Sequence, residues 1–169
     1  LSREESLSLV SAFIDAGDDI ARRCIERAAG NPLFLEQLLL GVKENNSESL
    51  PDSIKSLVLS RIDHLPREDK KALRAAAVLG QRFDLVSLRY LINSPAYECR
   101  GLIEHHLVRP EGALYLFAHA LIQEATYGSL LRRQRVELHK SASEWFVDRD
   151  LMLHAEHLDR AQDATATDA

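Results

Sequence analysis

The chain has 169 residues, of which 46% are hydrophobic and 28% charged, and its formal net charge is −5. This composition fits one soluble globular domain or two small ones, and the acidic balance argues against a dedicated nucleic-acid-binding protein. No apolar run approaches membrane-spanning length and the first residues do not resemble a signal peptide, so we expect a cytoplasmic protein. Because the sole methionine is Met152, we also expect a piece of a longer polypeptide.

Three helices are predicted before residue 46. Apolar residues between Leu7 and Ile14 recur at helical spacing, and a second helix begins after Asp18. The third helix begins at Pro32, and its expected buried face consists of Phe34, Leu35, Leu38, Leu39 and Val42. The polar stretch 43–49 is expected to be a loop or short linker.

Gly30, Asn31 and Pro32 combine a helix end with a helix start. Gly30 suits the left-handed position that ends a helix, Asn31 is a good N-cap, and Pro32 fits the first helical position. The three residues therefore predict a stiff joint between two helices. Such a joint is either purely structural, which the residues alone favour, or one wall of a site for a flat ligand.

The middle of the chain predicts further helices and one hairpin. The expected helices begin at Pro51, at Pro66, after Asp84, and at Ser94-Pro95, the last of them running to His106. Residues 107–109 and 113–117 then form a short hairpin around a turn at 110–112. A helix group followed by a hairpin is the order of a winged helix. Beyond Phe117 the helical pattern resumes and continues to about Ala161.

A winged helix can bind DNA through its third helix, which then needs Arg, Lys, Asn or Gln on its exposed face. Here that segment carries a mixed to acidic set: Glu98, Arg100, Glu104, His105 and His106. We therefore expect no DNA binding by this module. The basic residues Arg132, Arg133, Arg135 and Lys140 spread around a helix axis, and we interpret them as a solvated face or a partner contact.

Few residues in the sequence are candidates for binding or catalysis. His119 lies where the second strand of the hairpin gives way to a helix, a position that favours anions. It could donate to a phosphate or simply cap the helix. His154 and His157 stand three apart, but too few further ligands accompany them for a metal site. Cys24 and Cys99 are expected to be buried free thiols.

Several segments together resemble one known arrangement. They are 30–39, 50–66, Ala75 to Gly80, and Phe117 to Tyr127. In order and content these segments resemble the C-terminal part of the nucleotide-binding module of STAND ATPases, an AAA-related group of signalling proteins. The likeness is greatest to the bacterial kind fused to class III adenylate or guanylate cyclases or to LuxR-type regulators.

The resemblance implies a mainly α fold: a helical lid at 1–46, a connecting helix at 47–66, a winged helix at 67–131, and helices at 132–169 leading toward tetratricopeptide-like repeats. In that family the elbow proline packs near adenine, which implies a nucleotide contact for Pro32, with Gly30 and Asn31 beside it. The histidine after the wing contacts the β-phosphate of ADP, which implies the same for His119. The bound cofactor would be ATP or ADP.

The resemblance also limits the expectations. No phosphate loop is present in these residues, so we expect the fragment itself not to be an enzyme and to bind nucleotide feebly, although the parent protein would be an ATPase and could be a cyclase. Its partners would be its own nucleotide-binding core and C-terminal repeats. Ala118 replaces an arginine common in the family. The alternatives are a DNA-binding winged-helix transcription factor and a helical interaction scaffold.

Overall fold

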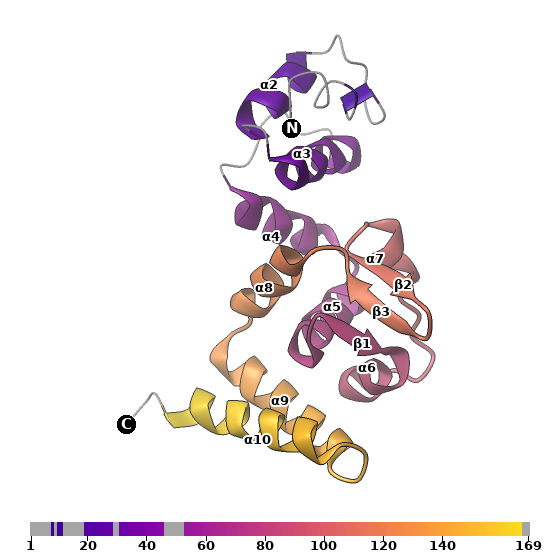
Figure 1. Cartoon of the computed structure of the whole chain (residues 1–169), viewed down its shortest axis with the longest axis vertical. Helices are drawn as coiled ribbons and strands as arrows, with labels where there is room; N and C mark the ends of the chain where they lie inside the picture. The colour runs from indigo at the N-terminus through magenta and orange to yellow at the C-terminus, as the bar shows by residue number, and fades with distance from the viewer. Residues whose placement is uncertain (1–7, 9, 12–18, 29–30, 46–52, 167–169) are drawn as a thin grey trace. The chain divides into compact units, whose positions relative to one another are not determined.

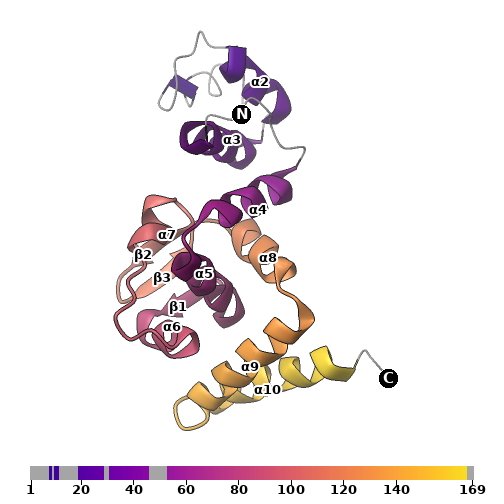
Figure 2. The same cartoon turned by 180° about the vertical axis from the view of Figure 1, so that it is seen from behind.

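The protein is described from a computed structural model (Figures 1 and 2). The structure describes residues 8, 10–11, 19–28, 31–45 and 53–166. Two compact units divide the chain, Leu1–His64 and Leu65–Ala169. The fold is mainly helical with one small antiparallel sheet, as the sequence predicts. None of the described helices is long and apolar enough to cross a membrane.

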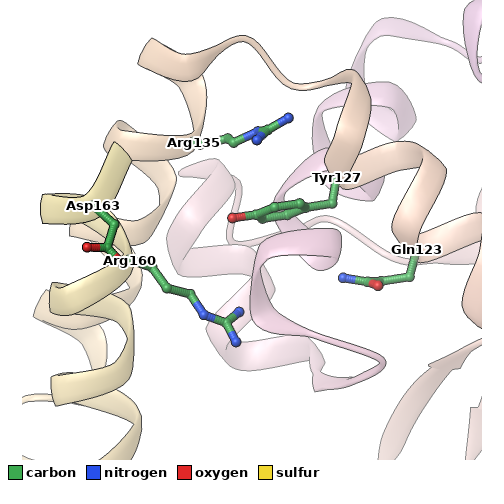
Figure 3. A pocket seen from close by; sticks show the side chains of 5 residues that line it. All are labelled: Gln123, Tyr127, Arg135, Arg160 and Asp163. Atoms are coloured by element: carbon green, nitrogen blue, oxygen red, sulfur yellow. The ribbon is translucent and has the colours of Figure 1, made fainter. Parts of the chain in front are cut away.

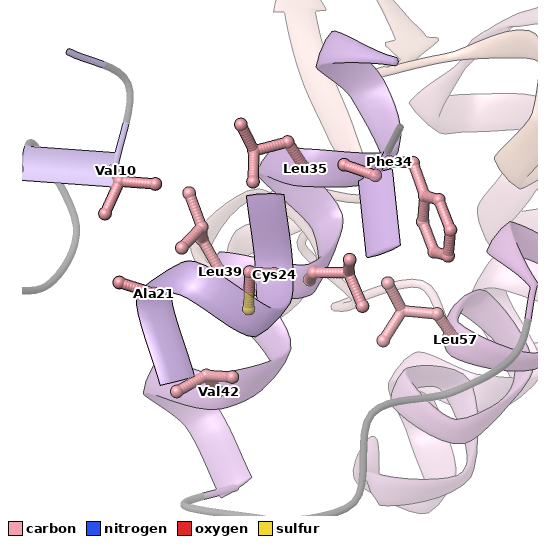
Figure 4. Packing of buried hydrophobic residues seen from close by; sticks show 10 residues of the cluster. Val10, Ala21, Cys24, Phe34, Leu35, Leu39, Val42 and Leu57 are labelled. Atoms are coloured by element: carbon pink, nitrogen blue, oxygen red, sulfur yellow. The ribbon is translucent and has the colours of Figure 1, made fainter. Parts of the chain in front are cut away.

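The first unit contains α2 (Asp19–Ala28), α3 (Pro32–Asn45) and α4 (Ile54–His64). Both α2 and α4 pack against α3. The predicted inward face of α3 is confirmed, since all five of its residues are buried in one apolar cluster (Figure 4). Labelled members of that cluster from other segments are Val10, Ala21, Cys24 and Leu57. Burial of this face supplies the apolar area that holds the short helices together.

The unit also encloses one polar pair. Arg61 on α4 donates through Nη1 to Oε1 of Gln37 on α3, and both residues are only 3% exposed. A buried guanidinium requires such an acceptor, because desolvation without one is costly.

Some predictions for the first unit lie outside the described residues. These are most of the helix between Leu7 and Ile14, and Gly30. Of the polar stretch 43–49, the first three residues continue α3 to Asn45, which corrects the expected start of the linker.

The second unit begins with α5 (Arg67–Leu79), β1 (Arg82–Asp84), α6 (Leu85–Ile92) and α7 (Arg100–Glu104), followed by β2 (Val108–Glu111) and β3 (Leu114–Phe117). This is the element order of a winged helix, and its strands are arranged in the order β1-β3-β2. The buried alanines of α5, predicted from their spacing, include Ala72, Ala76 and Ala77. Small side chains at these positions allow neighbouring helices to approach closely.

The hairpin is confirmed, but its turn is one to two residues later than predicted. Gly112, with φ of 61°, and Ala113 form a two-residue turn, which favours glycine at its first position. Pro110 consequently lies within β2. Because β2 is an edge strand, its missing N–H removes no internal ladder bond.

The strand β1 was not predicted from the sequence. Only Phe83 of its three residues is buried, and its ring stacks on Tyr115 with a centroid distance of 5.9 Å. The ring of Phe117 approaches Phe83 edge-on at the same distance. Three residues with one apolar side chain give no recognisable alternation, so pairing with β3 decides this strand.

The helix predicted between Pro95 and His106 is wrong in its first half. The structure has turns at that point, and α7 is only five residues long. Tyr97 explains the difference: its hydroxyl donates to Asp69 on α5 at 2.7 Å, and its carbonyl accepts from Nε of Arg89 at 2.8 Å. These tertiary contacts are made by the segment of turns that stands in place of the first half of the predicted helix.

The unit continues with α8 (Ala120–Ser129), α9 (Arg132–Phe146) and α10 (Leu151–Ala166). The last two pack along each other, and α9 also contacts α5 and α6. Tyr90 of α6 meets Trp145 of α9 with ring centroids 4.8 Å apart. The terminal helices therefore belong to the same compact unit as the winged helix.

Candidate functional site

At the predicted joint between α2 and α3, which we call the elbow, a helix starts at Pro32 as predicted. Asn31 is the N-cap of α3, since its Oδ1 accepts from the backbone N–H of Phe34 at 3.2 Å. Its own N–H donates to the carbonyl of Ala28 at 2.8 Å, which ties the start of α3 to the end of α2. Pro32, the first residue of α3, is exposed. The proline ring is therefore accessible while the backbone beside it is fixed.

His119 of the second unit is exposed and forms the N-cap of α8. Its Nδ1 accepts from the N–H of Leu121 at 3.2 Å. A neutral ring with Nδ1 as acceptor carries its proton on Nε2. The side chain therefore caps the helix with one nitrogen and has a donor on the other, at an end of a helix where the macrodipole favours anions.

Pro32 and His119 belong to different units, and each is described within its own unit. Pro32 is the first residue of α3, and His119 is the N-cap of α8. Gly30 lies outside the described residues.

A buried histidine pair was missed by the sequence analysis. Nδ1 of His139 on α9 lies 2.9 Å from Nδ1 of His157 on α10, and Nε2 of His139 lies 2.9 Å from the hydroxyl of Tyr127 on α8. Burial is the main cause that lowers the pKa of His139 to about 4, with smaller contributions from His157, Arg160 and Arg135. Burial also lowers the pKa of His157. Both rings are therefore neutral at pH 7 and join three helices.

His154 and His157 do not converge, although they are three residues apart on α10. Nδ1 of His154 lies 2.9 Å from both Oγ and the carbonyl oxygen of Ser143 on α9. His157 faces His139 instead. Each ring is thus engaged by a separate partner on the neighbouring helix.

The basic cluster predicted on α9 is divided between two environments. Arg133 is exposed and pairs with Glu137 at 2.8 Å. Arg135 lies over the ring of Tyr127, 4.9 Å from its centroid, and donates to the carbonyl of Gly128 at 3.1 Å. Figure 3 shows Arg135 and Tyr127 on the wall of a cavity. Gln123, Arg160 and Asp163 complete the lining.

The two buried thiols agree with the prediction. Cys24 and Cys99 are free and buried. Burial raises the pKa of Cys99 to about 12 and also raises that of Cys24. Neither thiol forms a nucleophilic thiolate at neutral pH.

Comparison with known proteins gives one informative similarity. The chain is 31% identical over 157 residues to an uncharacterized protein of Rhizobium meliloti strain 1021. The match covers 81% of this chain and 14% of the relative, so the chain spans about one seventh of that protein's length. No protein-family model and no solved structure matches the chain.

Proposed function

We propose that the chain is the lid and winged-helix part of a nucleotide-dependent switch of the STAND ATPase class. The observation that carries the proposal is the geometry of His119. It is exposed at the N-terminus of α8 and carries a donor on Nε2 while Nδ1 caps the helix. An imidazole N–H at the end of a helix where the macrodipole favours anions is a suitable contact for a terminal phosphate.

The elbow supports the same proposal from the first unit. Exposed Pro32 offers an apolar ring for a flat base, and the capping bond of Asn31 fixes its backbone. In the proposed mechanism ADP contacts the lid and the winged helix together with a core domain that carries a phosphate loop. When ATP replaces ADP, the contacts that ADP makes only in the closed arrangement are lost, and the population shifts to an open arrangement.

The attachment to a larger protein is part of the proposal. The phosphate loop and the Mg²⁺ ligands that ATP hydrolysis requires would be in residues that precede Leu1. The similarity to a much longer bacterial protein supports a multidomain parent. An adenylate or guanylate cyclase or a transcriptional regulator would be the output domain.

The test replaces His119 by asparagine in the longer protein. Asparagine is a good N-cap, so His119→Asn keeps the start of α8 and removes only the imidazole. We expect the amount of ADP that remains bound after gel filtration to fall at least tenfold. The matched control is His106→Asn, because His106 is exposed with φ of 51°, a conformation that asparagine tolerates.

Retention of ADP by His119→Asn at the wild-type level would contradict the proposal. A second measurement is calorimetric titration of ATP and ADP into the 169-residue chain. We expect no binding at micromolar concentrations, because Pro32 and His119 supply only part of the proposed site. Micromolar affinity for either nucleotide would contradict this description of the site.

A further inference from the structure

A second cavity in the winged-helix unit is lined by an unusual number of cationic side chains. It has a volume of about 480 Å³ and is lined from α5, α6 and α9 together with Leu130. Four of the lining residues are cationic and come from α5, namely Arg67, Lys70, Lys71 and Arg74. We call this space the basic cavity. Its volume lies within the range of small-molecule sites.

The spacing of the four cations places them on one face of α5. Arg67 and Lys71 are four residues apart, as are Lys70 and Arg74, and neighbours at this spacing face each other on a helix. Like charges in such positions repel and destabilise the helix unless an anion lies between them. A bound anion would therefore stabilise this face of α5.

The acidic residues of α5 accept hydrogen bonds from neutral hydroxyl groups. Glu68 accepts from Oγ of Ser94 at 2.8 Å, and Asp69 accepts from the hydroxyl of Tyr97 at 2.7 Å. Both acceptors are thus engaged by the segment between α6 and α7. Across the cavity, Glu137 of α9 is paired with Arg133 at 2.8 Å.

One cation of the basic cavity has an unused donor. Nε of Arg74 is buried and has no hydrogen-bond partner among the described residues. A buried guanidinium N–H without an acceptor is costly, and a bound anion would satisfy it. Lys71 is fixed at the cavity edge, where Nζ donates to the carbonyl oxygen of Ile92.

Apart from Glu137, which also lines the cavity and is paired with Arg133, the rest of the lining is apolar or neutral. Leu91, Leu130 and Leu138 contribute apolar surface, and Gln134 and Ser141 contribute neutral polar groups. Leu130 is buried, while Leu138 is half-buried. A ligand that matches both parts carries negative charge at one end and an apolar body at the other.

We propose that the basic cavity binds a small organic anion that has at least two negative charges and an apolar body. The site is separate from His119, which is at the start of α8 and does not line it. Since α9 and α10 pack along each other and α9 packs on α5, a ligand there contacts the elements that join the winged helix to the terminal helices (Figure 2).

The probe is 2-naphthyl phosphate, with uncharged 2-naphthol as the comparison. We expect 2-naphthyl phosphate to shift the backbone amide resonances of residues 67–74 and 134–141 in NMR titrations, with a dissociation constant that rises with salt. The naphthol should bind at least tenfold more weakly. Equal binding of the two compounds, or shifts confined to other segments, would overturn the proposal.

Substitutions inside and outside the cavity distinguish binding at this site from a general effect of positive charge. We expect Arg74→Gln to weaken binding of 2-naphthyl phosphate at least tenfold. Arg67→Gln, an exposed position, should weaken it several-fold and does not disturb the core. The matched control is Lys140→Gln on α9, which removes the same charge from an exposed residue outside the cavity.

Unchanged binding by Arg67→Gln and Arg74→Gln, or an equal loss in Lys140→Gln, would contradict the proposal. His119→Asn should leave binding of 2-naphthyl phosphate unchanged. The result for the basic cavity is therefore independent of the nucleotide switch.

Discussion

Nδ1 of His139 and Nδ1 of His157 face each other at 2.9 Å in the buried contact between α9 and α10. One nitrogen of such a pair must donate and the other must accept, so the contact holds one proton. A second proton would set two N–H groups against each other in a site with little water. The pair therefore stabilises the terminal helices only while at least one Nδ1 is unprotonated.

The first prediction concerns the stability of the folded chain at acidic pH. Since the pKa of His139 is about 4 in the folded chain and about 6.5 in the unfolded chain, the unfolded chain binds more protons between these values. Stability is thus full above pH 6.5 and falls as the pH decreases toward 4. The free energy of unfolding should fall by up to about 1.4 kcal/mol per pH unit for each histidine that titrates. Urea unfolding at several pH values measures this change in the free energy of unfolding.

In the His139→Gln variant this part of the pH dependence should disappear. A slope between pH 6.5 and 4 that is the same as in the wild-type chain would show that other groups cause it.

The second prediction concerns the hydroxyl that meets His139. Tyr127→Phe removes the partner of Nε2 in a buried site and should cost about 1 to 3 kcal/mol. Chemical denaturation followed by circular dichroism gives the value. Tyr115→Phe is the matched control, because Tyr115 is half-buried on β3, and its loss should be within about 0.5 kcal/mol. Similar losses in both variants would contradict a special role for Tyr127.

The third prediction concerns the start of α6. Oδ1 of Asp84 accepts from the N–H groups of Val86 and Ser87 at 2.9 and 2.8 Å, and Oδ2 accepts from the hydroxyl of Ser87. Asp84→Ala should therefore cost about 1 to 2 kcal/mol, whereas Asp84→Asn keeps a good N-cap and should cost less. Thermal unfolding of both variants distinguishes them, and equal losses would exclude capping as the cause.

The fourth prediction compares two glycines in helices. A Cβ on Gly101 would lie 2.9 Å from Cγ of Asp69, which accepts the hydrogen bond of Tyr97. Gly101→Ala should displace this carboxylate and cost about 1 to 3 kcal/mol. At Gly128 of α8 none of the described residues has an atom within 4 Å of such a Cβ, so Gly128→Ala should stabilise by up to about 1 kcal/mol. A stabilising Gly101→Ala would contradict the close contact.

Local patterns predicted most of the helices of this protein, because a buried face repeats at helical spacing and a cap requires particular residues. The inward face of α3 and the caps at Asn31 and Asp84 are examples. The position of His119 at the start of α8 was also predicted, and its Nδ1 acts as the cap. Whether it contacts phosphate remains a prediction.

The failures have a common origin. The strand β1 is too short for a periodic signal and exists through pairing with β3. The expected helix from Pro95 is replaced by turns because Tyr97 bonds to Asp69, 28 residues away. The basic cavity depends on which face of α5 meets α9, and the spacing of charges within α5 does not contain that information.

The sequence by itself determined the helical character, the capped helix starts and the hairpin of the wing, since these depend on residues within one or two turns of each other. Only the tertiary structure decided that His139 meets His157, 18 residues away, and that the buried Nε of Arg74 has no acceptor within the described part of the chain. Burial and the pairing of distant polar groups are set by how helices pack. The energies that determine titration and binding therefore arise only in the folded chain.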